Sequence, residues 1–194
     1  MSAALYAALY AALCAALLAP IVTIGSWFVG PLMWRDFNSV RQTISALAAR
    51  GVPSRYVVTT AFVVAGLCYI VVAVAITDLG ALGRLTLAVG GIAQLGVAAA
   101  PLPSPEGYSV AHTRVAGVQF LAMALWPVAG LVTTAGAPWL LTPLGATLSS
   151  VFLLLLLVVY VVNLRRQSGF VGLTERIVVA AMSIWPLVLV LSIA

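Results

Sequence analysis

The chain has 194 residues, enough for one domain, and its composition excludes a soluble fold. Hydrophobic residues make up 64% of it and charged residues 7%, whereas soluble domains carry roughly 25% charged residues. Because so much apolar surface needs lipid as its solvent, we predict a polytopic membrane protein. The net charge of +5 is not gathered on a soluble basic face, so nucleic acid is not an expected partner and anionic lipid is.

Six apolar segments are long enough to cross the hydrocarbon core, which takes about 20 helical residues. The predicted fold is therefore all-α, with six transmembrane helices in one bundle that forms a single domain over residues 1–194. Gly90, Gly91 and Gly96 indicate close helix packing in the third segment. Cys14 and Cys68 lie inside apolar runs and are predicted to be free thiols. The six segments are about 4–30, 55–77, 83–101, 113–135, 138–163 and 174–194.

The arginines are distributed unevenly between the two sides of this predicted bundle. The loops after the first, third and fifth segments carry all of them except Arg84, and the chain contains no lysine. The positive-inside rule then predicts that these loops are cytoplasmic and that both termini are extracytoplasmic. Arginine-only basic residues with heavy alanine, leucine and valine usage favour a bacterial source, and hence the bacterial inner membrane. Arginines that serve a binding site would produce the same asymmetry.

A polar segment at 34–55 interrupts the apolar chain. Its S-x-x-Q pattern, Ser39 to Gln42, is typical of a helix capping box, and Gly51 and Pro53 predict a stop. We expect a short interfacial or re-entrant helix at about 40–49, too short to span. On it, Val40, Ile44 and Leu47 would share one face, while Arg41 and Ser45 lie on another.

Two stretches of this sequence resemble a known family. ISALAARGVPSR at 44–55 and PLPSPEGYSVAHTRVAG at 101–117 resemble a bacterial six-helix membrane family catalogued as domain of unknown function nine-nine-eight. A more distant likeness is to lipid-remodelling proteins of the Frag1 type. The resemblance implies that Asp36, Ser45 and His112 match the family's polar pattern. The family has no established activity to carry over, and it places an acidic residue soon after the proline of the third loop, where this chain has Ser104, Pro105 and then Glu106.

The single histidine, His112, is the main candidate for chemistry because histidine titrates near neutral pH. We predict that it transfers protons, oriented by Asp36 or Glu106; the alternative is a structural capping residue. Gln119 lies seven positions further along the same predicted helix, on the same side as His112. One histidine cannot form a three-histidine zinc site, and no C-x-x-C pair is present, so we predict no metal and no cofactor.

Guanidinium groups can clamp phosphate or carboxylate, and the predicted ligand-binding set follows from this. Its alternative is a structural network of ion pairs. Ser45 lacks the G-x-S-x-G motif that would mark a nucleophile. Glu175 and Arg176, after the predicted cap Thr174, are interpreted as helix-start residues near the helix dipole. The ligand-binding set is Arg41, Ser45, Arg50, Arg114 and Gln119.

Three functions are compatible with the sequence. The first is binding or modification of the headgroup of a membrane lipid or isoprenoid, at a one-sided cluster of arginine, aspartate and histidine. The second is a structural subunit that binds a protein partner through its polar loops. The third is a small transporter or channel, which would need a water path past Gln94 and Gln119. We rank the lipid site first and the transporter last.

Overall fold

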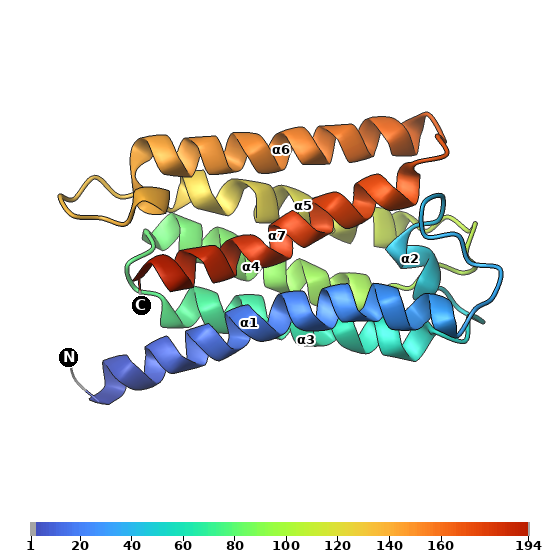
Figure 1. Ribbon diagram of the computed structural model, residues 1–194, viewed down its shortest axis with the longest axis horizontal. Coiled ribbons are helices and arrows are strands. Elements are labelled where there is room, and N and C mark those ends of the chain that lie inside the picture. The colour runs from blue at the N-terminus through green and yellow to red at the C-terminus, as the bar shows by residue number, and fades with distance from the viewer. Residues whose placement is uncertain (1–2, 194) are drawn as a thin grey trace.

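The computed structural model describes residues 3–193, in which helices run side by side along the long axis (Figure 1). The first residues of α1 and the last residues of α7 lie at one end of the bundle, and the short helix α2 lies at the other (Figure 1). The fold is all-α over the described residues. Its elements are α1 (Ala3–Leu32), α2 (Ile44–Leu47), α3 (Arg55–Ala75), α4 (Ala81–Ala99), α5 (Val110–Ala129), the 3₁₀ helix η1 (Trp139–Leu141), α6 (Pro143–Arg165) and α7 (Val171–Ile193).

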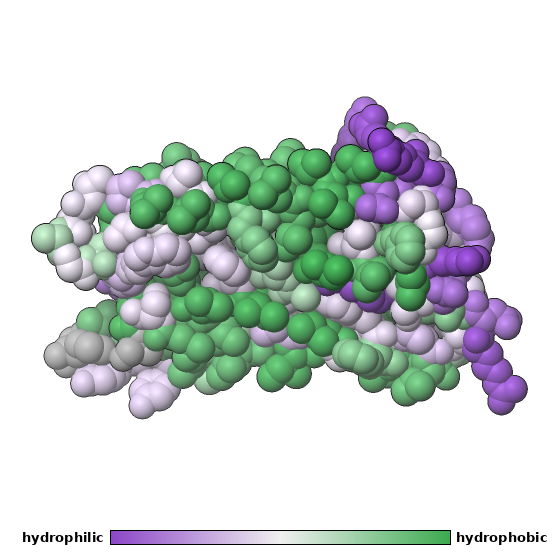
Figure 2. Space-filling view, turned by 45° about the horizontal axis from the view of Figure 1, so that its top comes forward, coloured by the Kyte–Doolittle hydropathy of each residue, from purple (hydrophilic) through white to green (hydrophobic). Residues whose placement is uncertain are grey.

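Five helices, namely α1, α3, α4, α6 and α7, are long and apolar enough to cross a membrane. The protein is therefore a multi-pass membrane protein. The remaining long helix, α5, has 20 residues and carries His112 and Arg114 in its first turns. Apolar side chains cover the middle of the bundle and hydrophilic ones gather at a single end (Figure 2). We call this the polar end; it holds the segment 33–54, the α4–α5 loop and the α6–α7 loop.

The helices pack closely because small residues face one another. A Cβ atom on Gly91 would lie 2.6 Å from the carbonyl oxygen of Gly66, and one on Gly66 would lie 2.8 Å from that of Gly91. The predicted close packing of α4 is thus confirmed, and α3 is its neighbour. The main hydrophobic core runs through the bundle, and a second cluster around Ile44 and Leu47 lies at the polar end. The two cysteines are free, as predicted.

The two largest differences from the predicted spans are at the start of α6 and the end of α5. The helix α6 begins at Pro143 rather than near 138, because Thr142 accepts a hydrogen bond from the Gly145 amide and so caps it. Proline is favoured at the first helical position because its missing N–H would have no partner there. The helix α5 ends at Ala129, about six residues early, and its C-cap is Gly130.

The prediction of a helix over residues 40–49 is wrong in its extent, because only Ile44–Leu47 is helical. The predicted capping box does not form around Ser39. Instead, Asn38 accepts bonds from the Val40 and Arg41 amides, and the Gln42 side chain accepts one from the Asn38 amide. These bonds make residues 38–42 a turn, and Thr43 in extended conformation then caps the short helix.

The short helix is tucked against the bundle, where it contacts α1, α3 and α7. Ile44 and Leu47 are 1% and 0% exposed, whereas Val40 is 42% exposed and lies outside the helix. The predicted apolar face is therefore present at two of its three positions.

Candidate functional site

Ser45 and His112 form a hydrogen-bonded pair at the polar end, although 67 residues separate them in sequence. The Nε2 atom of His112 lies 3.0 Å from the Oγ atom of Ser45, and its Nδ1 atom lies 2.9 Å from the carbonyl oxygen of Ala100. His112 is 7% exposed and Ser45 is half-buried. The pair thus joins α2, the end of α4 and the start of α5.

Local capping and one backbone bond position the pair. Ser109 accepts a hydrogen bond from the His112 amide, so α5 begins just before the imidazole. Thr43 caps α2 because its hydroxyl oxygen accepts a hydrogen bond from the Ala46 amide, and this places Ser45 in the first turn of α2. The Arg50 amide donates to the Leu102 carbonyl at 2.9 Å and joins the segment after α2 to the α4–α5 loop.

The partners of His112 determine which nitrogen carries the proton. A carbonyl oxygen only accepts, so Nδ1–H donates to Ala100 and Nε2 of the neutral ring is an acceptor. The Ser45 hydroxyl therefore donates to Nε2. A hydroxyl bonded to an imidazole that a third group orients is the arrangement of an activated serine nucleophile. In this chain the third group is a backbone carbonyl.

A second buried polar cluster lies beside the first, built on Glu175 and Arg176 of α7. Glu175 is 3% exposed, and its carboxylate accepts the Ile44 amide at 2.5 Å and the Tyr160 hydroxyl. Ile44 is the residue before Ser45, so Glu175 holds the start of α2. A charged side chain is rarely buried without such partners.

Arg176 holds the turn that precedes α2. Its Nη1 atom donates to the carbonyl oxygens of Ser39 at 2.7 Å, Gln42 at 2.9 Å and Gly172 at 2.9 Å. The Phe37 ring lies 5.5 Å from its Cζ atom. Its Nε and Nη2 atoms are buried and have no hydrogen-bond partner. Gly172 allows this approach, because a Cβ there would lie 2.6 Å from the Ser39 carbonyl oxygen.

The interpretation of Glu175 and Arg176 as helix-start residues is wrong. The helix α7 begins at Val171, and the Thr174 hydroxyl donates to carbonyls one turn back instead of capping a helix. Both charged residues lie in the second turn of an apolar helix. Adjacent charges inside a candidate span, rather than at its end, are the signal that could have identified this cluster.

The other predicted site residues lie apart from the Ser45–His112 pair. Arg114 follows His112 by two positions, which do not face each other on a helix. Gln119 is 7% exposed and lies about two helical turns from His112 along α5. The remaining side chains make no hydrogen bond with any part of the chain that the structure describes, and Asp36 and Glu106 are not partners of His112. The exposed predicted residues are Asp36, Arg41, Arg50, Glu106 and Arg114.

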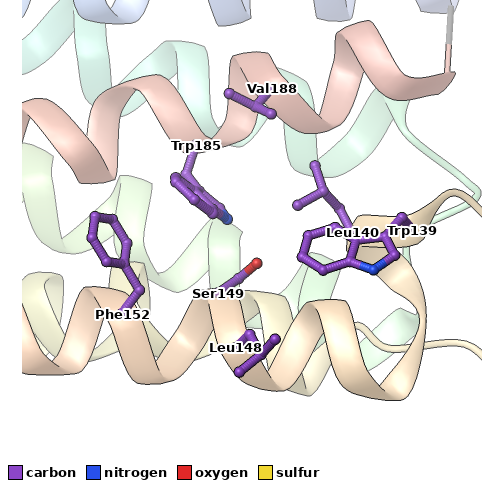
Figure 3. A pocket seen from close by; sticks show the side chains of 7 residues that line it. All are labelled: Trp139, Leu140, Leu148, Ser149, Phe152, Trp185 and Val188. Carbon is purple, nitrogen blue, oxygen red and sulfur yellow. The ribbon is translucent and has the colours of Figure 1, made fainter.

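No group of three or more histidine, cysteine, aspartate or glutamate side chains within residues 3–193 could hold a metal ion. A cavity of about 350 Å³ lies between α6, α7 and η1 (Figure 3). Apart from two tryptophans, its lining has one side chain with a polar atom, Ser149, whose hydroxyl donates to the Gly145 carbonyl of its own helix. Gln94 and Gln119 line neither this cavity nor a second one beside Arg84.

Comparison with known proteins identifies one family. No curated protein and no solved structure matches the chain significantly. The family model described as "Protein of unknown function (DUF998)" matches residues 4–192, almost the whole chain. The chain, with its helical bundle and polar end, therefore belongs to the DUF998 family.

Proposed function

We propose that this protein acts on an ester in the headgroup region of a membrane lipid, with Ser45 as the nucleophile and His112 as its base. The observation that carries the proposal is the bond of 3.0 Å between Ser45 Oγ and His112 Nε2, with Nδ1 held by the Ala100 carbonyl. In the same proposal α5 is the sixth membrane-spanning helix, and the polar end faces the cytoplasm of a bacterial cell.

The reaction would have two steps. His112 Nε2 takes the Ser45 hydroxyl proton as Oγ bonds to the acyl carbon or the phosphorus, and it then protonates the leaving alcohol oxygen as the ester bond breaks. In the second step, water or another alcohol gives a proton to Nε2 and its oxygen displaces Ser45, which recovers its proton. The Nδ1–H bond to Ala100 persists throughout and holds the ring.

The location of the pair supports a lipid substrate. Ser45 lies in α2 and His112 in the first turn of α5, at the polar end of the bundle (Figure 1). The apolar surface of the bundle gives way to hydrophilic side chains at this end (Figure 2), which in this proposal is the level of the lipid headgroups. Exposed arginines surround this end and would attract anionic headgroups, including an isoprenoid phosphate, through their long-range field. They are Arg41, Arg50 and Arg114.

A serine-directed alkyl fluorophosphonate tests the proposal on the protein in lipid nanodiscs, because the probe reports nucleophilicity without a known substrate. We expect peptide mass spectrometry to find the label on Ser45. Ser45→Ala should abolish it, and His112→Gln should slow it by about 10²–10⁴-fold, the usual contribution of a general base.

Ser168 offers a matched control at the same end of the bundle. Its hydroxyl donates to the Asn163 side chain instead of a histidine, so Ser168→Ala should leave labelling unchanged. Absence of label on Ser45 would refute the proposal. Equal labelling rates in His112→Gln and the unaltered protein would also refute it, provided that thermal denaturation shows both proteins to be folded.

A further inference from the structure

We propose that the unpaired edge of the Arg176 guanidinium binds the phosphate group of the ligand on which Ser45 acts. This inference rests on the proposed function and names the ligand chemistry of the same site: a phosphate monoester or diester. No sequence pattern marks Arg176 for this role.

The hydrogen bonds of Arg176 are divided between its two sides. Nη1 alone donates to three carbonyl oxygens, those of Ser39, Gln42 and Gly172, and so anchors the polypeptide. Nε and Nη2 are buried and unpartnered. An Nε–H and an Nη2–H together form the planar fork that binds two oxygens of a phosphate or carboxylate at once.

No protein group among the described residues accepts a hydrogen bond from this fork. The neighbouring carboxylate of Glu175 interacts with the charge of Arg176, but its hydrogen bonds are to the Ile44 amide and the Tyr160 hydroxyl, and neither Nε nor Nη2 bonds to it. A buried donor without a partner costs about 1–3 kcal/mol, more when it is charged. Anchoring the turn uses only Nη1, so it does not explain why the protein bears the cost of burying Nε and Nη2 without partners. An anion bound at the fork would remove it.

The fork is close to the Ser45–His112 pair. Arg176 bonds to the carbonyl of Gln42, which precedes Ser45 by three residues, and Glu175 bonds to Ile44, directly before Ser45. Three residues span at most about 10 Å of extended chain. The guanidinium that carries the fork and the nucleophile are thus both held to one short segment, residues 42–45.

Phe37 covers the guanidinium face, and its turn must move to admit the anion. The Phe37 ring is half-buried and packs at a tilt against Trp34, with 5.2 Å between ring centroids. Its amide bonds to the Trp34 carbonyl, within the same turn. Movement of the turn at 34–37 would break apolar contacts of Trp34 and Phe37 with the Ile44 cluster, but none of the hydrogen bonds that hold Ser39, Gln42 and α2.

The test compares the unaltered protein with Arg176→Lys, which keeps the positive charge and an anchor for the carbonyls but has no fork. In nanodiscs containing phosphatidylglycerol, native mass spectrometry should show at least about 10-fold less bound phosphatidylglycerol on Arg176→Lys than on the unaltered protein. Arg166→Lys, at an exposed position of the same end, should retain it fully. Nanodiscs of phosphatidylcholine and a titration with inorganic phosphate complete the arms.

Several outcomes distinguish this inference from the proposed function. Loss of phosphatidylglycerol in Arg176→Lys, with Ser45 labelling by the small fluorophosphonate unchanged, supports both. Equal retention in the two proteins, together with an equal response to inorganic phosphate, overturns the inference, whatever the labelling shows. Loss of labelling at Ser45 in the unaltered protein, with lipid retention still dependent on Arg176, refutes the proposed function alone.

The remaining arms identify the source of the phosphate. Stabilisation of the unaltered protein by inorganic phosphate, absent in Arg176→Lys and without lipid retention, supports the fork and assigns it a soluble phosphate. If Arg176→Lys does not fold, Phe37→Ala replaces it, because that change uncovers the fork and leaves its anchoring bonds. Phe37→Ala should then exchange phosphatidylglycerol several-fold faster, and an unchanged exchange rate would overturn the inference.

Discussion

The two ends of the bundle use their polar side chains differently. At the polar end, buried polar groups from α5 and α7 converge on one short segment, residues 39–45. At the opposite end, Arg84 bonds to the carbonyls of Ala73 and Val74 where α3 ends, and the other side chains that line the cavity beside it are apolar. The first arrangement fixes the Ser45–His112 pair between helices, whereas the second completes a helix end.

The same comparison separates two kinds of charge within the polar end. Most of its arginines are exposed, which costs little and is what the positive-inside rule requires. Glu175 and Arg176 are buried, and each bonds to backbone atoms more than 130 residues away in sequence. Burial and long-range partners therefore mark the candidate site better than the number of charges does.

The largest expected effect is on Arg176. Arg176→Met removes the donor of three carbonyls and leaves Glu175 without a neighbouring positive charge, so we expect unfolding in mixed micelles to become easier by about 3–5 kcal/mol. Arg166→Met, which changes an exposed arginine, should stay within about 0.5 kcal/mol. Equal effects of the two changes would remove the distinction between buried and exposed arginines.

Next in size is the contact between α7 and the turn at 38–42. A Cβ on Gly172 would collide with the carbonyls of Gln42 and Ser39, so Gly172→Ala should destabilise the protein by about 1–3 kcal/mol. Gly117 of α5 has nothing within 4 Å of such a Cβ, and Gly117→Ala should be neutral or stabilise by up to about 1 kcal/mol. A destabilised Gly117→Ala together with an unaffected Gly172→Ala would contradict the packing described.

A smaller effect distinguishes the serines of the two ends. Ser45→Ala leaves the buried His112 Nε2 without its donor and should cost about 1–2 kcal/mol in the same unfolding assay. Ser149 bonds only to a carbonyl of its own helix, a bond that slightly weakens helices, so Ser149→Ala should cost nothing measurable. The account fails here if Ser149→Ala costs as much as Ser45→Ala.

The smallest effect belongs to the exposed arginines. Arg41→Gln combined with Arg114→Gln should change the free energy of unfolding by less than about 0.5 kcal/mol, because neither side chain has a hydrogen-bond partner among the described residues. A loss of 2 kcal/mol or more, about four times that limit, would show that these arginines belong to a structural network after all.

Composition and hydropathy predict the all-α membrane fold, because lipid requires long apolar helices whatever their packing partners. Composition also singles out His112 as the one histidine, whereas Ser45 is predicted through the resemblance to the family. The contact between them depends on where residues 38–42 turn, and Asn38 and Thr43 decide that locally. The role of Glu175 and Arg176 depends on bonds to residues more than 130 positions away, which no local pattern encodes.

The most direct measurement of the central claim is nitrogen-15 NMR of the imidazole, which is unambiguous because His112 is the only histidine in the chain. At about pH 8, above the ordinary histidine pKa of about 6.5, the account predicts a neutral ring with the proton on Nδ1. It also predicts that Nε2 is an acceptor, with a nitrogen-15 shift that changes in Ser45→Ala. A ring protonated on Nε2, or a spectrum unchanged by Ser45→Ala, would contradict the claim that Ser45 donates to His112.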